Sequence, residues 1–329
     1  MNRRPTLSLF ALFLALILAF PVLAQEGDIA TSGRSLGSFS IHPLDYNPLG
    51  PDSDGPLVYD GKPIELSYRI ENGDVELSVG MAFFVDGAIQ PHEVTATTQD
   101  VQLENAEQAI SIYHLKANES VEFTIRFTPV LGKKGDRLSF RRAVIFNPDY
   151  LPKDETGSMG IYGDAHPSEF GTIQFEADAP AQLATQLIDL ETTELSEPIA
   201  QINVHKAVPD FPGYLINDGS GEPYMPPRVT AVDGKIRGQI QLWDGADAAY
   251  RLTFFVNNKP ILNGDTDNVI LSVPDGNLAT YPFELDLPEG LPKLNSFFAT
   301  ILPVGDGYQV YPEAGHKFST VLLINPDAE

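Results

Sequence analysis

The chain has no cysteine and fewer than half as many basic as acidic residues. It holds 329 residues, with 21 lysines and arginines against 45 aspartates and glutamates. The absence of cysteine excludes disulfides, thiolate metal sites, cysteine nucleophiles and thiol-linked lipid anchors. The formal net charge of −24 disfavours nucleic acid and anionic membranes, because their phosphates repel such a surface. We therefore expect partners other than nucleic acid.

The motifs that mark several enzyme classes are also missing. The sequence has no H-E-x-x-H pattern, no P-loop and no strand-led G-x-G-x-x-G. None of its six histidines forms an i, i+2 or i, i+4 pair that would preset two metal ligands. Carboxylates are so abundant that closeness in sequence does not single out a general acid and base. We expect a protein that is not an enzyme.

The first 24 residues have the pattern of a secretory signal peptide. Arg3 and Arg4 precede an apolar run from Leu7 to Phe20, and the small residues around Ala24 suit signal peptidase. The run is shorter than the roughly 20 residues that a membrane-spanning helix needs. Cleavage after Ala24 removes two arginines and takes the net charge from −24 to −26. The sequence predicts a secreted protein with no later membrane span, and leaves periplasm and exterior open.

Alternating apolar and polar residues predict many short β-strands. The alternation is clearest in Ile64–Ile70, Val121–Phe127 and Phe283–Leu287. Such strands place one face on a core and the other in water. Helical spacing occurs only around Leu183–Leu190 and Gln99–Ala109. Turn residues separate the strands without crossover helices, which favours an antiparallel sandwich over a βαβ fold.

The two halves of the chain carry similar segments in the same order, which indicates an internal duplication. Each pair on its own is short enough to arise by chance. The aligned pairs are Asp60–Ile70 with Asp233–Leu242, Ala82–Gly87 with Thr253–Asn258, Leu138–Phe146 with Leu294–Leu302 (Ala143 on Ala299), Phe170–Ile173 with Phe318–Val321, and Ser40–His42 with Asn203–His205.

The predicted fold is all-β, with two tandem immunoglobulin-like or fibronectin-like antiparallel β-sandwich domains after the signal peptide. Each copy has the length and strand number of such a sandwich. We expect the first domain at residues 25–178, a linker at 179–198 that holds one helical turn or one strand, and the second domain at 199–329. A linker this short would limit the relative motion of the domains without fixing it.

Trp243 is the only tryptophan and the first candidate for a ligand-binding residue. It follows the polar phase of its strand, after Arg237, Gln239 and Gln241, so alternation directs its ring to solvent. An exposed indole beside Asp244 can stack on a sugar ring or anchor a protein interface.

The long connection from Pro209 to Val232 is the second part of this candidate site. Its prolines, which include Pro212, Pro223, Pro226 and Pro227, reduce the entropy lost when the loop is held in one shape. The loop either lines the recognition surface with Trp243 or covers the ring, and the sequence leaves both open. Its aromatic candidates are Phe211, Tyr214 and Tyr224.

A calcium site is the only cofactor that the sequence suggests. Asn263, Asp265 and Asp267 stand at i, i+2 and i+4, so a curled loop can aim three oxygens at one cation. The EF-hand pattern is not followed, because Asn268 stands in the glycine position and Pro274 in the glutamate position. The alternative is a solvated turn, since Asp and Asn favour turns through their own hydrogen bonds.

These features predict a non-enzymatic protein of the cell surface or extracellular space. It would act in adhesion, surface assembly or protein binding through sandwich loops and edge strands. The alternative is a carbohydrate-binding protein that uses the aromatic residues around Trp243. The expected partner is thus an extracellular protein or a glycan, and the sequence leaves the oligomeric state open.

Overall fold

The computed structural model describes residues 37–46, 54–96, 108–160, 162–163, 165–181, 183–190, 192–194, 213–217, 228–243, 248–266, 268–273, 277–305 and 320–328. These residues form strands and turns, with no helix among them. In the same residues there is accordingly no helix long and apolar enough to cross a membrane. The predicted signal peptide and nearly all of the helix expected at Gln99–Ala109 lie outside this part of the chain.

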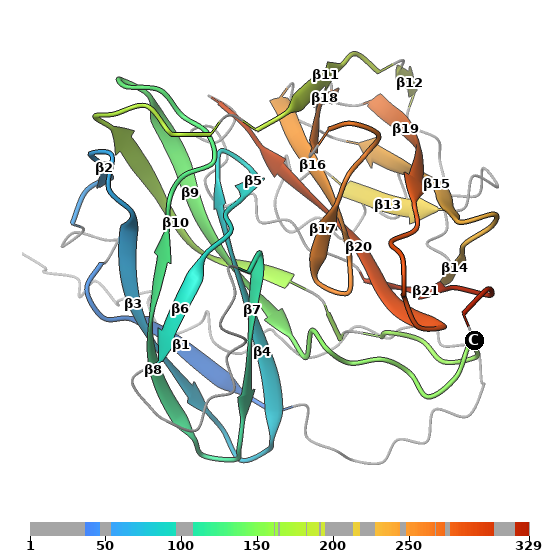
Figure 1. The fold of residues 1–329 in the computed structure, drawn as a ribbon, viewed down its shortest axis with the longest axis horizontal. Coiled ribbons are helices and arrows are strands. Elements are labelled where there is room, and N and C mark those ends of the chain that lie inside the picture. Colours follow the sequence, from blue (N-terminus) through green and yellow to red (C-terminus); the bar gives the residue numbers. More distant parts are fainter. Residues whose placement is uncertain are drawn as a thin grey trace, which may run out of the picture. The chain divides into compact units, whose positions relative to one another are not determined.

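The first sandwich is built from two sheets, drawn from blue to green in Figure 1. The four-stranded sheet has the order β1 (Phe39–Pro43), β3 (Ile64–Asn72), β8 (Ser120–Phe127), β6 (Glu93–Ala96). The six-stranded sheet has the order β2 (Leu57–Tyr59), β10 (Ala165–Phe175), β9 (Arg137–Phe146), β4 (Leu77–Val85), β5 (Ala88–Ile89), and β7 (Ile110–Leu115) also pairs with β4.

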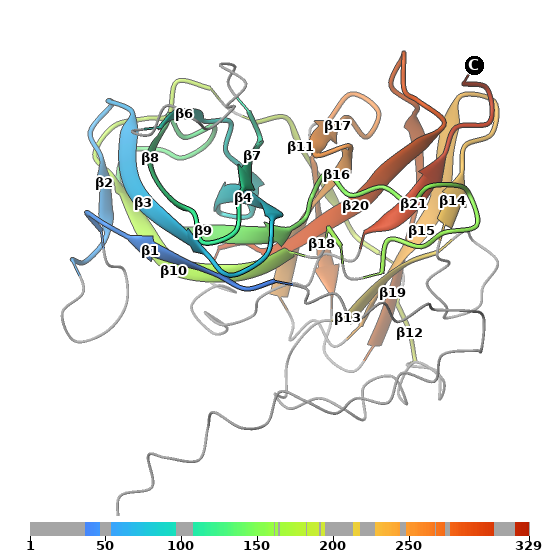
Figure 2. The ribbon, with the colours of Figure 1, turned by 90° about the horizontal axis from the view of Figure 1, so that it is seen from below.

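The second sandwich again has two sheets (Figure 2). Its four-stranded sheet has the order β12 (Thr192–Glu194), β19 (Asn277–Asp286), β15 (Lys235–Trp243), β13 (Gly213–Asn217). The seven-stranded sheet has the order β11 (Thr185–Ile188), β18 (Asn268–Val273), β16 (Ala248–Val256), β20 (Leu294–Pro303), β21 (Val321–Ile324), β14 (Arg228–Thr230), and β17 (Lys259–Ile261) also pairs with β16.

The two sandwiches share most of their topology, but β12 precedes β13 in the chain, whereas β6, at the same position in its sheet, follows β5. The order β1-β3-β8-β6 corresponds to β13-β15-β19-β12, and β2-β10-β9-β4-β7 corresponds to β14-β21-β20-β16-β18. One parallel pairing also repeats, since β2 joins β10 and β14 joins β21 in parallel. The predicted all-β fold of two tandem immunoglobulin-like sandwiches is confirmed, and the repeated strand order supports the duplication.

Each sandwich encloses its own apolar core. The predicted alternation is visible in β3, where Leu66, Tyr68 and Ile70 are at most 2% exposed. The first core continues through residues such as Phe83 and Phe123, and the second core has its own large set. Burial of these side chains is the main favourable term for a chain without disulfides. Typical members of the second core are Ile240, Leu252, Phe254, Phe283, Phe297 and Leu323.

One predicted alignment between the copies is shifted by one residue. Phe84 pairs with Arg141 across the first sheet, whereas Phe255 pairs with Phe298 across the second. Arg141 therefore occupies the place of Phe298, and Ala143 does not occupy the place of Ala299. Because a one-residue shift moves every side chain of a strand to the opposite face, the predicted match paired residues that lie on opposite faces of their sheets.

The N-terminal match between the copies, Ser40–His42 with Asn203–His205, also finds no support. The strand in the place of β1 is β13, because β1 pairs with β3 as β13 pairs with β15. Residues 203–205 lie outside the described residues. His42 is exposed, and its Nε2 atom lies 3.0 Å from the hydroxyl of Ser40.

The segment expected to be a linker forms two strands of the second sandwich. β11 adds in parallel to β18, and β12 adds in antiparallel fashion to β19. Of the two alternatives for this segment, one helical turn or one strand, the structure has a strand over Thr185–Ile188. Its leucine spacing fits a helix, but the sheet edges offer backbone hydrogen-bond partners, and such tertiary context overrides a weak local preference.

Candidate functional site: the sandwich interface and the open sheet edges

The two sandwiches meet through equivalent sheets, in an apolar cluster separate from both cores. The rings of Phe255 and Phe298 are stacked there with centroids 4.8 Å apart. Gly37–Glu329 forms one compact unit. The sandwiches are therefore held together by this contact as well as by the segment that connects them. The buried members of this interface cluster are Ala82, Phe84, Ile89, Ile110, Ala143, Ile145, Phe255, Phe298 and Leu302.

The tight turn between β4 and β5 contacts the second sandwich. Asp86 and Gly87 have φ angles of 47° and 76°, as a type I′ hairpin turn requires at both central positions. A Cβ atom on Gly87 would lie 3.0 Å from Cβ of Arg251 and 3.1 Å from the carbonyl oxygen of Leu302. Glycine is needed here both for the backbone conformation and for the close approach.

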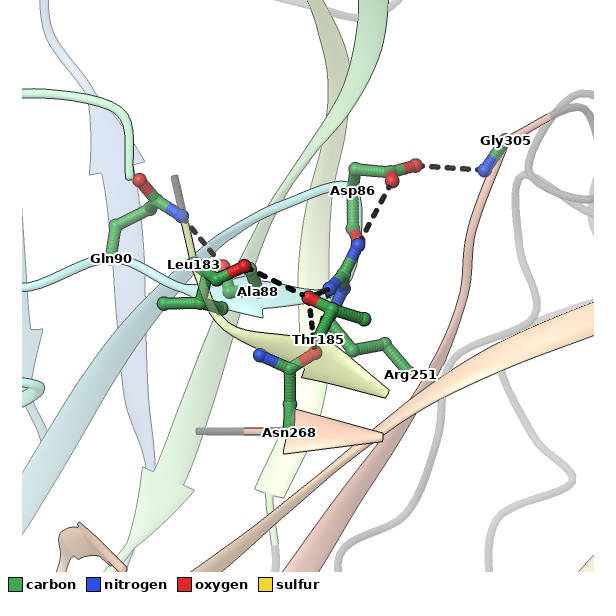
Figure 3. A network of polar contacts seen from close by, with 8 residues as sticks. All are labelled: Asp86, Ala88, Gln90, Leu183, Thr185, Arg251, Asn268 and Gly305. Atoms are coloured by element: carbon green, nitrogen blue, oxygen red, sulfur yellow. Dashed lines mark hydrogen bonds and ion pairs between the residues drawn. The ribbon is translucent and has the colours of Figure 1, made fainter. Parts of the chain in front are cut away.

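Arg251 of β16 is the centre of a polar network that joins the sandwiches (Figure 3). Its Nε donates to the carbonyl oxygen of Asp86 at 2.8 Å, and its Nη2 lies 3.3 Å from the carboxylate of the same residue. Its Nη1 donates to Oδ1 of Asn268 at 2.7 Å and to the hydroxyl of Thr185 at 3.1 Å. Asp86 also accepts the backbone N–H of Gly305 at 2.8 Å. One side chain thus connects the β4–β5 turn with β18 and β11.

The Asp86–Arg251 ion pair is largely removed from water. The side chains of Asp86 and Arg251 are 14% and 5% exposed. Burial lowers the pKa of Arg251, and the nearby Asp86 carboxylate opposes that shift. Guanidinium remains protonated in proteins, so the buried charge needs its partner, and loss of one member of such a pair is costly.

The corresponding turn of the second sandwich contacts the first. Asn257 and Asn258 have φ angles of 48° and 64°, and Nδ2 of Asn258 donates to the carbonyl oxygen of Pro148 at 2.9 Å. Pro148 stands seven residues after Arg141, as Gly305 stands seven after Phe298. Each turn therefore contacts the same position of the other copy, which is the reciprocity of a two-fold interface.

The connection between β9 and β10 adds a third contact between the sandwiches. Met159, which is 1% exposed, packs with Leu322 and neighbouring apolar residues of the second sandwich. Glu155 forms an ion pair with Lys293, and its carbonyl oxygen accepts a hydrogen bond from Arg228. Apolar and polar contacts thus hold this connection on the β20–β21 side.

The buried charges of this region were not among the residues that the sequence pattern predicted to be functional. Arg141 and Arg142 are 1% and 4% exposed, and the guanidinium of Arg142 lies 4.9 Å from the ring centroid of Tyr68. Arg251 was missed as well. The sequence signal for these residues was an arginine inside an otherwise apolar strand. Such a side chain is almost never fully buried unless it is paired, so its position indicates a buried polar contact.

Trp243 is buried, so of the two alternatives that the sequence left open, an exposed ring or a covered ring, the structure has the covered one. The residue is 2% exposed. The predicted phase is correct, since Trp243 lies outside the core cluster that contains its neighbour Leu242. Its backbone pairs with Gly213 of β13 and with Leu278 of β19. Alternation identified the face of the strand, whereas what covers that face depends on tertiary packing.

Of the other candidate ligand-binding residues, only Tyr214 lies in the part of the chain that the structure describes. Tyr214 lies on β13, where its backbone pairs with Leu242. Phe211, Tyr224 and Asp244 lie outside the described residues. The described residues therefore show a buried Trp243, and the grouping of the other candidates with it stays a prediction.

The candidate calcium loop contains a tight turn. Asn263 and Thr266 exchange backbone hydrogen bonds, and the amide of Asn263 donates to the hydroxyl of Tyr281. Asp265 is exposed, and Asp267 lies outside the described residues. The part of the chain that is described holds no group of three or more His, Asp or Glu side chains suited to a metal. Calcium binding at this loop stays a prediction.

A serine, a histidine and an aspartate meet on the surface of the first sandwich without the arrangement of a catalytic triad. The hydroxyl of Ser78 lies 2.9 Å from Nδ1 of His114. The same Nδ1 lies 3.5 Å from the carboxylate of Asp149. A triad needs opposite ring nitrogens for the nucleophile and the acid, so this cluster does not activate Ser78 in that way.

A second serine–histidine pair lies inside the first sandwich. Nε2 of His92 is hydrogen-bonded to the hydroxyl of Ser111, and Nδ1 lies 3.0 Å from the carbonyl oxygen of Gln90. His92 and Ser111 are at most 1% exposed. Burial lowers the pKa of His92 to about 4, so the ring is neutral near pH 7. With no access for a substrate, the pair is part of the packing.

Each of the four sheets ends in edge strands that are available for contact with another molecule. Within the described residues β11 pairs only with β18 and β7 only with β4, and the strands at the other sheet ends (β1, β2, β6, β12, β13 and β14) likewise have one partner each. On β11 the side chain of Leu187 is 71% exposed, the largest value among the exposed large apolar side chains. Edges with unpaired backbone groups accept further strands unless they are protected.

Comparison with known proteins adds similarity at low identity only. No protein-family model and no curated protein sequence matches the chain. Among solved structures, the chain is similar to the Salmonella enterica SafA pilin in complex with the SafB chaperone, at 12% identity and a TM-score of 0.25, over 88% of this chain and 98% of that one.

Two other solved structures show similarity of the same kind. The Escherichia coli chaperone DraB matches at 11% identity and a TM-score of 0.23, over 81% of this chain and 96% of that one. The CsuC–CsuE chaperone–tip subunit complex of Acinetobacter baumannii matches at 10% identity and a TM-score of 0.20, over 88% and 100%. At these TM-scores no function is transferred from those proteins.

Proposed function

We propose that the mature chain is an exported, non-enzymatic protein that binds another protein through an open sheet edge. The observation that supports this most is β11, whose Thr185, Gln186 and Leu187 are all exposed. A leucine 71% exposed on an edge strand combines apolar area with available backbone groups. That combination favours the addition of a partner strand.

The network around Arg251 supports this proposal, because it holds β11 in place before any partner arrives. The hydroxyl of Thr185 accepts from Arg251 and donates to Oδ1 of Asn268 at 3.2 Å. An edge that is already ordered loses less conformational entropy when a partner binds. The acidic charge of the chain additionally favours a basic partner at low salt.

The signal-peptide pattern of residues 1–24 supports export to the periplasm or the exterior. The alternative of carbohydrate binding at Trp243 is not retained, because a ring that is 2% exposed cannot stack on a sugar. Adhesion and surface assembly are the two settings in which a protein partner would be met.

Leu187→Lys tests the proposal, with Leu262→Lys as the matched control. Leu262 is 55% exposed but lies in the connection between β17 and β18, off the edge. The mature chains would be compared for capture of proteins from the surface fraction of the source cell. We expect Leu187→Lys to lose a partner that Leu262→Lys keeps, because a charge on an edge opposes strand addition. Equal capture by both variants, or turnover of a substrate by the purified chain, would overturn the proposal.

A further inference from the structure

Three side chains of the first sandwich bring one donor atom each close together. Ser78 of β4 stands directly opposite His114 of β7, on strands that lie side by side (Figure 1). The hydroxyl oxygen of Ser78 lies 2.9 Å from Nδ1 of His114 and 3.3 Å from Oδ2 of Asp149. The same Oδ2 atom lies 3.5 Å from the same Nδ1 atom. One nitrogen and two oxygens therefore form a compact triangle.

The size of this triangle matches one face of a metal coordination shell. Zinc binds imidazole nitrogen and carboxylate oxygen at about 2.0–2.2 Å. Ligand atoms at that distance are about 3.3–3.6 Å apart in a tetrahedral shell and about 2.8–3.1 Å apart in an octahedral one. The separations of 2.9, 3.3 and 3.5 Å fall within these ranges. Convergence on one ring nitrogen, which excludes a catalytic triad here, is the arrangement that a shared cation requires.

Backbone contacts fix the position of Asp149 relative to β4. Asn147 donates its backbone N–H to the carbonyl oxygen of Ser78 at 2.9 Å, and its Oδ1 accepts the backbone N–H of Ser78 at 2.8 Å. The next residue, Pro148, accepts a hydrogen bond from Asn258 of the second sandwich. The pairing of β4 with β7 places the other two donor atoms. A cation would thus meet ligands that are already in position, which lowers the entropic cost of binding.

The triangle is accessible to solvent on a strongly acidic chain. The side chains of His114 and Asp149 are 58% and 42% exposed, whereas Ser78 is 8% exposed. Water can therefore complete a coordination shell from the solvent side. The net charge of −24 favours cations over anions. Because the third donor is a serine, the site differs from a cluster of three His, Asp or Glu side chains, of which the described residues hold none.

We propose that Nδ1 of His114, Oδ2 of Asp149 and the hydroxyl oxygen of Ser78 hold a divalent transition-metal ion such as Zn²⁺, with water in the remaining positions. The imidazole nitrogen favours such a metal over Ca²⁺ and Mg²⁺, which prefer oxygen ligands. A bound ion would connect β4 and β7 with the segment that follows β9. This site is separate from β11 and does not depend on the proposed function.

Titration calorimetry of the mature chain with Zn²⁺, and thermal unfolding with and without the ion, test this site. At a free zinc concentration of about 100 times Kd, we expect Tm to rise by about 4 °C, because a ligand of the native state stabilises it by mass action. His114→Gln and Asp149→Asn should each weaken zinc binding at least about tenfold. Ca²⁺ at the same concentration should leave Tm unchanged, and an equal rise with Ca²⁺ would overturn the assignment.

His42→Gln is the matched control. Nε2 of His42 lies 3.0 Å from the hydroxyl of Ser40 and 3.9 Å from the carboxylate of Glu71, so similar residues are present with the carboxylate too far away for one shell. Both histidines are exposed, and both variants should therefore keep the Tm of the unchanged chain without zinc. His42→Gln should also keep the zinc affinity. Failure of the unchanged chain to bind zinc, binding that survives His114→Gln, or equal loss in both variants would overturn the proposal.

Discussion

The ion pair between Asp86 and Arg251 should be strongly coupled, and a double-mutant cycle measures this. Asp86→Asn keeps a residue that tolerates the φ angle of 47° and removes only the charge. It leaves the guanidinium, whose side chain is 5% exposed, without a counter-ion. Loss of one partner of a buried pair costs roughly 3–5 kcal/mol. Because Asp86 keeps some exposure, we expect about 3 kcal/mol, at the lower end of that range.

This free energy converts to a measurable melting shift. Unfolding entropy is about 2.1 cal/mol/K per residue, which gives about 0.6 kcal/mol/K for the compact unit and a decrease in Tm of roughly 5 °C for Asp86→Asn. Arg251→Met alone should also destabilise, since it removes hydrogen bonds to Asn268 and Thr185. The double variant should be more stable than the sum of the single losses predicts, because no unpaired charge remains; we expect a coupling of about 2 kcal/mol.

The control cycle uses Arg237 and Glu284, whose side chains are 47% and 55% exposed. Solvent screens that pair, so Arg237→Met and Glu284→Gln should be additive within error. Calorimetry of all variants in one buffer gives both cycles. Additivity at Asp86 and Arg251 as well would refute the view that this pair stabilises the contact between the sandwiches.

Three further predictions concern single positions. Gly87→Ala should lower Tm more than Gly234→Ala, because both have positive φ (76° and 68°) but only the Cβ at position 87 meets other atoms, among them the carbonyl oxygen of Leu302; equal shifts in calorimetry would contradict the close approach. Burial holds the pKa of His92 at about 4, against about 6.5 in the unfolded chain. The contribution of His92 to stability is therefore fully present above pH 6.5 and is lost progressively as the pH falls toward 4. Urea unfolding should therefore show a loss of about 2 kcal/mol from this group between pH 7.5 and 5, and His92→Gln should lose correspondingly less over that interval; an unchanged pH dependence would count against a buried neutral ring. Trp243→Ala should destabilise the chain by roughly 3–5 kcal/mol as a buried aromatic does, and native Trp243 fluorescence should resist acrylamide quenching; ready quenching would show that the ring is exposed.

Strand periodicity alone determined much of this fold. The alternation in Ile64–Ile70 depends only on which side chains prefer water, and β3 places those residues as the pattern predicts. The Phe-Phe-Val segments likewise identified β4 and β16 as copies of one strand. A period of two is a local property, so sequence suffices to find it.

Register between strands needed the tertiary structure. The alignment of Ala143 with Ala299 was plausible in sequence, yet the pairing of Phe84 with Arg141 and of Phe255 with Phe298 shifts it by one position. Similar strand sequences do not specify which residues face each other across a sheet. Only the pairing shows that Ala143 lies between the sandwiches and Ala299 inside a core.

The candidate sites depended even more on contacts between distant segments. Sequence determined the absence of thiol chemistry, the acidic charge and the polar phase of Trp243. The tertiary structure decided that this residue is buried, that β11 and β12 join the sheets of the second sandwich, and that Asp86 meets Arg251 from 165 positions away. Burial and pairing are properties of two surfaces in contact, and a single strand's sequence describes only one of them.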